Sequence, residues 1–180
     1  MKITAIETIP VSVPVGRFRD GMDKVAGHDA PARYHKGRVL EIVRPRNADG
    51  FMILSNVIVK IHTDAGITGI GEAACDQTEP VEVVRAMLDR HMAPKLIGED
   101  PLDWRVLIDL LSWESARGAT RFSTSGIDLA LHDLVGKILR VPVYTLLGGC
   151  RREKVLAGIE VPRGTPEHMA EHSYEYFQQG

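Results

Sequence analysis

Residues 125–149, SGIDLALHDLVGKILRVPVYTLLGG, constrain the fold of this 180-residue chain more than any other stretch. Apolar side chains recur there at the spacing of one helix face. They are Ile127, Leu131, Leu134, Val135 and Ile138. Ser125 is a residue type that caps helix starts, and Pro142 cannot continue a helix. The segment therefore predicts one amphipathic helix, a proline stop and a Gly-Gly turn.

The composition is that of an ordinary globular protein and excludes several classes. Hydrophobic residues make up 44% and charged residues 26% of the chain, which suits a packed core. The net charge of -2 offers no basic surface for nucleic acid. No apolar run is long enough for a membrane span, and MKITAIETIP lacks the apolar core of a signal peptide. We therefore expect a cytoplasmic protein that binds neither nucleic acid nor membrane.

Cys75 and Cys150 are the only cysteines in the chain. Two cysteines are too few for a disulfide scaffold, and they lack the C-x-x-C spacing of zinc sites. We predict that both are reduced and structural.

The first part of the chain predicts a small antiparallel sheet. Residues 3–13 alternate as a strand, and Pro10 and Pro14 mark an edge-like end. Residues 57–61 and 67–73 predict two further strands, joined as a hairpin by the turn residues at 63–66. The glycines of G-I-T-G-I-G do not open a helix as a phosphate-binding loop would, so we interpret them as turn and strand glycines.

Two helices are predicted between this hairpin and residue 125. Asp76, with Glu79 three residues later, predicts a cap for the first, and Pro80 lies in its first turn. The second begins at Asp100-Pro101. Its apolar side consists of Trp104, Leu107, Ile108 and Leu111, with Asp103 in its first turn. The fold class is therefore α+β, a three-stranded antiparallel sheet with a helical bundle, over a domain of residues 1–140.

The pattern changes after Gly149. A short apolar strand at residues 155–161 precedes Pro162-Arg163-Gly164 and a helix from about Pro166. This order predicts a linker and the first βα unit of an incomplete (β/α) barrel over residues 141–180. A whole barrel needs about 250 residues. Either the natural protein continues or a partner copy packs against this unit, because a lone strand exposes its edges.

Three motifs in this chain resemble the enolase superfamily, specifically its mandelate racemase/muconate lactonizing enzyme branch, in order and spacing. They are MKITAIETIPVSVP at the start, VIVKIHTDAGITGIGEA at residues 57–73, and Asp128, Ala130, Val141, Pro142, Val143, Leu146, Leu147, Gly148 and Gly149. They leave uncovered mainly residues 15–54. The resemblance implies a capping domain, a barrel and a homo-oligomer.

The resemblance also implies a chemistry. Enzymes of this branch abstract a proton next to a carboxylate and hold the enediolate on a magnesium ion. The Lys-x-Lys bases and the three acidic ligands of the family are expected after Gly180, so we assign no catalytic residue and no metal ligand within this chain. The acidic cluster of Glu72, Asp76 and Glu79 is interpreted as helix capping and a solvated loop.

In this family, loops after the first strand and before the second close over the substrate. Residues 15–54 occupy that place and hold many donors suited to a carboxylated or hydroxylated acid, with glycines that would let them act as a lid. The predicted substrate-binding residues are Arg17, Arg19, Tyr34, His35, Arg38, Glu160 and Arg163. The alternatives are a solvated loop for the first five and a salt bridge to the cap for the last two.

Three further histidines lie on predicted helices. His168 and His172 lie four residues apart on one predicted helix face, but Met169 stands where a zincin has glutamate. An exposed helix face is the preferred interpretation. His132 lies beside an apolar stripe and is interpreted as a packing histidine.

We expect the parent enzyme to be a magnesium-dependent racemase, epimerase, cycloisomerase or dehydratase of a carboxylate substrate, with sugar-acid dehydration favoured. The alternative is a catalytically silent cap-domain fragment with a structural or assembly role. In both cases the 180-residue chain alone is expected to be inactive.

Overall fold

A computed structural model describes residues 1–14, 33–35, 38–40, 53–75, 80–115, 121–155, 158, 161 and 165–179. The chain divides into two compact units, and each has its own elements. One comprises Met1–Val13 with Ile53–Arg151, and the other comprises Pro14–Met52 with Arg152–Gly180.

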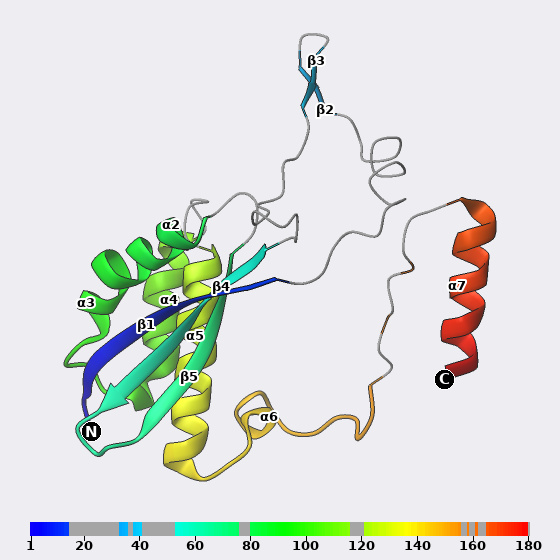
Figure 1. Ribbon diagram of the computed structural model, residues 1–180. Helices are drawn as coiled ribbons and strands as arrows, with labels where there is room; N and C mark the ends of the chain where they lie inside the picture. The colour runs from blue at the N-terminus through cyan, green and yellow to red at the C-terminus, as the bar shows by residue number, and fades with distance from the viewer. Residues whose placement is uncertain are drawn as a thin grey trace. The chain divides into compact units, whose positions relative to one another are not determined.

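The first unit contains a three-stranded antiparallel sheet, which confirms the predicted strands. Its order is β1 (Ile3–Pro14), β4 (Ile53–Thr63) and β5 (Thr68–Cys75) (Figure 1). β4 and β5 form the predicted hairpin, and Gly66 adopts φ 75° in its turn, a left-handed conformation that glycine adopts without strain. β1 is an edge strand. Proline is tolerated in an edge strand, because the N–H that Pro10 lacks can be one that would face away from the neighbouring strand.

Helices follow the sheet along the chain. A nearly continuous run begins after Pro80, and a second helix begins after Asp100, whose carboxylate accepts a hydrogen bond from the Leu102 N–H at 3.0 Å. The elements are α2 (Val81–Met87), the π-helical η1 (Leu88–Met92), α3 (Ala93–Leu96), the 3-10 turn η2 (Pro101–Asp103), α4 (Trp104–Ser115), α5 (Arg121–Leu139) and α6 (Val143–Leu146).

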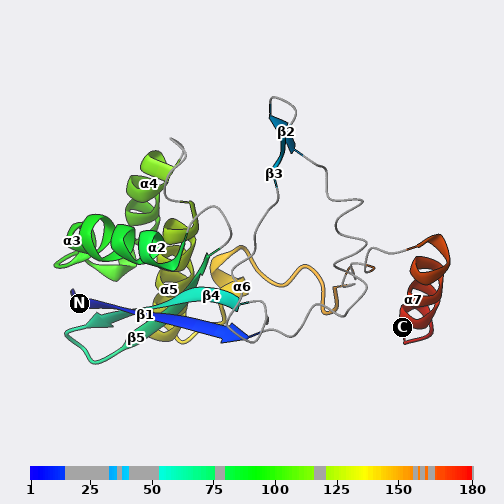
Figure 2. The ribbon, with the colours of Figure 1, turned by 45° about the horizontal axis from the view of Figure 1, so that its top comes forward.

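The helices α2 to α5 lie over one face of the sheet (Figure 2). Along β4, alternate residues Val57, Val59 and Ile61 are fully buried, as the two-residue period of a strand requires. From α5, the residues of the predicted apolar stripe meet them in one core. Ile127, Leu131, Leu134 and Val135 are buried, and Ile138 is partly buried. The stripe is therefore confirmed as the central packing face.

α5 approaches β5 so closely that only glycine fits at two strand positions. A Cβ built on Gly71 would lie 2.2 Å from the Gly126 carbonyl oxygen, and one built on Gly69 would lie 2.2 Å from that of Ala130. Both obstacles are helix backbone, which cannot turn aside as a flexible side chain can. Gly69 and Gly71 are therefore glycines because α5 packs too close to β5 for any side chain.

α5 ends as the sequence predicts, before Pro142. Arg140 adopts φ 56°, and the Val141 N–H donates to the Gly136 carbonyl at 2.9 Å, which satisfies one of the carbonyls left open at a helix end. Pro142 then occupies the N-cap position of α6.

The two predicted side-chain caps were wrong. α5 begins at Arg121, so Ser125 lies one turn inside it, because Ser123 and Thr124 are already packed as buried helical residues. α2 begins at Val81 with Pro80 at its N-cap and no side-chain cap. Asp76 and Glu79 lie outside the described residues. The N-cap of α2 is Pro80, four residues after the Asp76 that was expected to cap it.

The second unit contains a two-stranded antiparallel sheet of β2 (Arg33–His35) and β3 (Arg38–Leu40) and the helix α7 (Pro166–Gln179). The hairpin falls within residues 15–54, which we expected to be a loop. α7 confirms the helix predicted from Pro166. Val155, Gly158 and Val161, the described residues of the predicted strand 155–161, are not in a strand, and a parallel strand needs hydrogen-bonded neighbours to persist.

Candidate functional site

The predicted substrate-binding residues fall into two groups. Arg17, Arg19, Glu160 and Arg163 lie outside the residues that the structure describes. The other three lie on the β2–β3 hairpin, where the backbone register pairs Tyr34 with Val39 and His35 with Arg38. The hairpin thus places His35 and Arg38 directly across from each other, and substrate binding by all seven residues stays a prediction.

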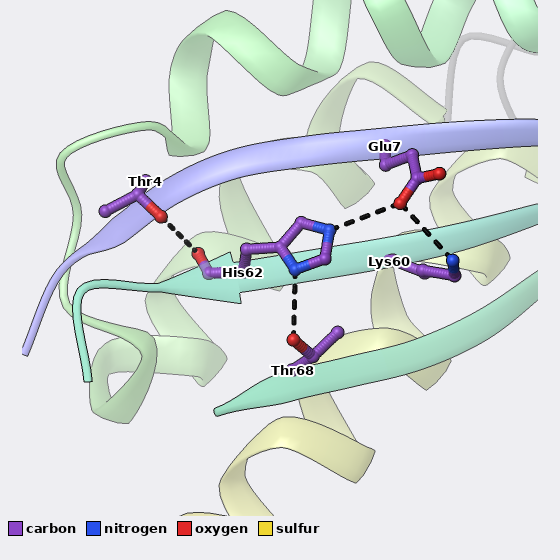
Figure 3. Close-up of polar contacts among 5 residues, drawn as sticks. All are labelled: Thr4, Glu7, Lys60, His62 and Thr68. Carbon is purple, nitrogen blue, oxygen red and sulfur yellow. Dashed lines mark hydrogen bonds and ion pairs between the residues drawn. The ribbon is translucent and has the colours of Figure 1, made fainter. Parts of the chain in front are cut away.

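Polar side chains converge on the sheet face opposite the core, where three strands contribute (Figure 3). Glu7 of β1 lies 3.3 Å from the Lys60 Nζ and 3.4 Å from the His62 Nε2, both on β4. The His62 Nδ1 lies 3.0 Å from the Thr68 hydroxyl on β5. All four groups are partly exposed, and the cluster lies on an open strand surface. It can therefore link neighbouring strands, but it does not enclose a substrate.

The cluster lowers the pKa of Glu7 below its usual range. The hydrogen bond from Lys60 is the largest cause, the charges of Lys60 and His62 add to it, and partial desolvation opposes it. A carboxyl whose pKa is lower in the folded protein stabilises the fold above its unfolded pKa of about 4.3. That stabilisation is lost as the pH falls through the lowered folded value.

Replacing Lys60 by methionine is expected to raise the pKa of Glu7 toward its ordinary value, because methionine keeps the aliphatic stem and removes the donor and the charge. The titration of the Glu7 side-chain carboxyl, followed by carbon NMR, measures the shift. Stability in urea should then fall less between pH 7 and pH 3 than it does in the parent chain. An unchanged Glu7 titration would show that Lys60 does not cause the shift.

A second candidate site lies along the seam between α5 and β5. An open pocket of about 430 Å³ is lined there by Ile58, Ile70, Gly71, Glu72, Leu129, His132, Asp133 and Val143. Its walls are mainly apolar, and three ionisable residues, Glu72, His132 and Asp133, stand among them.

Asp133 and Lys137 connect α5 to the outer edge of β5. The Asp133 carboxylate accepts hydrogen bonds from the Ile70 N–H and the Lys137 Nζ, each at 2.7 Å. Lys137 also donates to the Thr68 carbonyl at 2.9 Å. Backbone groups of an exposed strand edge are thus satisfied by the helix. Sequence analysis missed this pair, although the i,i+4 spacing of an acid and a base on a predicted helix was a signal for it.

Replacing Asp133 by alanine is expected to lower the free energy of unfolding by about 1–2 kcal/mol, because it removes the acceptor of the Ile70 N–H and leaves Lys137 with only the Thr68 carbonyl. Asp133→Asn should cost less, since its amide oxygen still accepts from the backbone. Urea titration followed by circular dichroism measures both. The matched control is Asp109→Ala on the exposed side of α4, expected within about 0.5 kcal/mol. Equal losses of unfolding free energy at positions 133 and 109 would show that the contact of Asp133 with β5 does not stabilise the fold.

The structure confirms that His132 is a packing residue, as the sequence predicts. Its side chain is only 13% exposed, and its ring centroid lies 4.5 Å from that of Trp104. The Nδ1 lies 2.9 Å from the Asp128 carbonyl oxygen and 3.0 Å from its Oδ1. Nδ1 carries one proton, which it donates to the Asp128 carbonyl oxygen. The Asp128 Oδ1 is therefore buried without a hydrogen bond, and the His132 Nε2 is likewise buried without a partner among the described residues.

The described part of the chain contains no group of three or more His, Cys, Asp or Glu side chains placed to hold an ion. Glu72 is engaged instead in a close hydrogen bond with the Asn56 amide. The described residues therefore do not fit a magnesium site of oxygen ligands. None of the helices in the same described ranges is both long and apolar enough to cross a membrane.

Comparison with known proteins connects this fold to enzymes. A family model for the N-terminal domain of mandelate racemase/muconate lactonizing enzyme matches residues 52–148. The chain is 30% identical over 131 residues to chloromuconate cycloisomerase of Cupriavidus pinatubonensis, an alignment of 70% of this chain and 35% of that protein. It is 40% identical over 104 residues to D-xylonate dehydratase of Haloferax volcanii, covering 55% of this chain and 24% of that one.

A solved structure extends the similarity to the whole chain. N-succinyl Arg/Lys racemase from Bacillus cereus is 27% identical, with a TM-score of 0.72 over 100% of this chain and 42% of that one. In the two curated relatives above, the match spans 35% and 24% of their length. The chain thus corresponds to the amino-terminal part of larger enzymes.

Proposed function

The chain belongs to the mandelate racemase/muconate lactonizing enzyme family, and we propose that it is the amino-terminal part of an enzyme that abstracts a proton next to a carboxylate group. The match of residues 52–148 to the family model carries this proposal. The relatives include a cycloisomerase, a racemase and sugar-acid dehydratases, which have in common a substrate with a carboxylate.

Within that class we propose dehydration of a sugar acid, with racemisation or epimerisation as the competing reaction. Support comes from the 40% identity to D-xylonate dehydratase and to a D-galactonate dehydratase family member of Halomonas elongata. Identity to the cycloisomerase and to N-succinyl-L-Arg/Lys racemase is lower, at 30% and 32%.

In this proposal the chain supplies the cap of the active site. Residues 1–140 form the capping domain, and residues 141–180 form the linker and the first βα unit of the barrel. The α5–β5 seam holds the sheet rigid, and the segment between β1 and β4 carries the donors that select the substrate. Arg17, Arg19 and Arg38 would bind the carboxylate, while Tyr34, His35, Glu160 and Arg163 would contact hydroxyl groups.

The family is generally magnesium-dependent. In those enzymes the ion stabilises the enediolate, but the described residues offer no set of ligands that fits it. We propose that the magnesium ligands and the Lys-x-Lys bases belong to residues that follow Gly180 in a longer protein. We also propose a cytoplasmic homo-oligomer.

The decisive experiment joins the chain to the in-frame coding sequence after Gly180 and assays the product with magnesium and a set of acids. We expect dehydration of D-xylonate, D-galactonate or D-mannonate, loss of activity in EDTA, and none from the 180-residue chain. Arg38→Gln should raise KM more than it lowers kcat, because a binding contact is removed. Turnover by the 180-residue chain, or turnover of N-succinyl amino acids alone, would contradict the proposal.

A second candidate is a catalytically silent cap fragment with a role in assembly. A stop codon directly after the Gly180 codon would support the silent fragment, and an open reading frame with Lys-x-Lys and spaced acidic residues would exclude it.

A further inference from the structure

Two histidines on α7 bring their Nε2 atoms together. His168 and His172 lie four residues apart on α7, and their Nε2 atoms are 3.1 Å from each other. The ring centroids lie 4.4 Å apart, with the ring planes inclined at 70°. The i,i+4 spacing thus brings the two Nε2 atoms within hydrogen-bond distance of each other. An ion bound to both nitrogens would replace the proton between them.

That separation suits two ligands of one metal ion. Zn–N bonds to histidine are about 2.0–2.1 Å long, so two nitrogens 3.1 Å apart subtend an angle of about 100° at the ion, close to tetrahedral. We propose that His168 and His172 form a binding site for a borderline divalent cation of the Zn²⁺, Ni²⁺ and Cu²⁺ class, with water in the remaining positions. The site is independent of the proposed reaction.

Glu175 supports this arrangement from behind the second imidazole. Its Oε2 lies 3.1 Å from the Nδ1 of His172, and its side chain is 55% exposed. A carboxylate at Nδ1 favours the tautomer with the proton on that nitrogen, which leaves the Nε2 lone pair for a metal. The triad of carboxylate, imidazole and metal is a recurrent way of orienting a ligating histidine.

The donor chemistry separates this site from a magnesium site. Magnesium requires oxygen ligands in octahedral geometry, whereas neutral imidazole suits zinc, nickel and copper. The His172 side chain retains a quarter of its surface exposed, so an ion can reach the pair from solvent. Because the ion would bridge two residues one turn apart, its binding would also stabilise the helical conformation of α7.

The test is a zinc titration of the nitrogen-15-labelled full chain, followed by long-range proton–nitrogen NMR of the imidazole rings. We expect Zn²⁺ to shift the Nε2 resonances of His168 and His172 together, with one ion bound and the Nδ1 of His172 still protonated. The rings of His62, His91 and His132 should not change in step with them. Absence of Nε2 shifts at millimolar zinc would overturn the proposal.

Variants test the geometry rather than the number of histidines. His168→Gln and His172→Gln should each weaken zinc binding at least about tenfold, because one imidazole loses the high effective concentration of the other. Glu175→Gln should weaken it up to about tenfold, the lower range for a residue behind a ligand.

The matched control is the double variant H172Q/S173H, which keeps the histidine count and moves one imidazole to another face of α7. Its zinc affinity should fall as far as that of His172→Gln, while circular dichroism confirms that the helix content is kept. An affinity equal to that of the parent chain would show that the paired Nε2 atoms do not form the site.

Discussion

Replacing Gly71 by alanine is expected to lower the free energy of unfolding by about 3 kcal/mol, the upper end of the usual overpacking range. The added Cβ would lie 2.2 Å from the Gly126 carbonyl oxygen and 2.5 Å from the Ala130 amide nitrogen. Both atoms belong to the backbone of α5, so relief requires a shift of the whole helix away from β5. Urea denaturation followed by circular dichroism measures the loss.

Gly66→Ala is the control for this prediction. Its φ of 75° strains an alanine, but nothing lies within 4 Å of the added Cβ. The expected loss is about 1 kcal/mol, from backbone conformation alone. If both variants lost the same stability, close packing between α5 and β5 would not be the reason for glycine at position 71.

Truncation of Leu131 to alanine is the second large effect, with an expected loss of about 3 kcal/mol. Leu131 is fully buried on the face of α5 that meets the sheet. Its removal forfeits the transfer energy of the side chain and leaves a cavity that a rigid helix–sheet contact closes only in part. The midpoint of urea denaturation should fall, with the slope of the transition unchanged.

Leu129→Ala provides the same chemical change on the same helix at a position that is 50% exposed. Its expected effect stays within about 0.5 kcal/mol. Because alanine is a better helix former than leucine, a loss at position 129 as large as that at position 131 would show that burial in the core does not determine the effect.

The elements of the first unit were largely predictable because their signals are local. The alternation along β1, the hairpin at residues 63–66 and the stripe of α5 each depend on the period of one element. The helix starts were less predictable. Ser125 has the chemistry of a cap, yet Ser123 and Thr124 already lie buried within α5, because packing against the core extends a helix beyond its local start signal.

The contacts within the candidate sites were even less predictable from the sequence than the helix starts. The sequence identified donors such as His35 and Arg38, but only the hairpin register pairs them. Nothing in sequence spacing links Glu7 to Lys60, or Asp133 to the Ile70 N–H, because each pair is joined by the folding of distant segments. His168 and His172 shared a predicted face, but their separation of 3.1 Å depends on side-chain rotamers.

By itself, the sequence determined the order of the strands and main helices of the first unit, the apolar face of α5 and the family resemblance, because periodicity and motif spacing are properties of the chain. The tertiary structure alone decided why Gly69 and Gly71 are glycines, which groups close the edge of β5 and where the nitrogens of α7 meet. The first two depend on the approach of distant segments, which packing selects once the core has formed, and the third depends on side-chain rotamers.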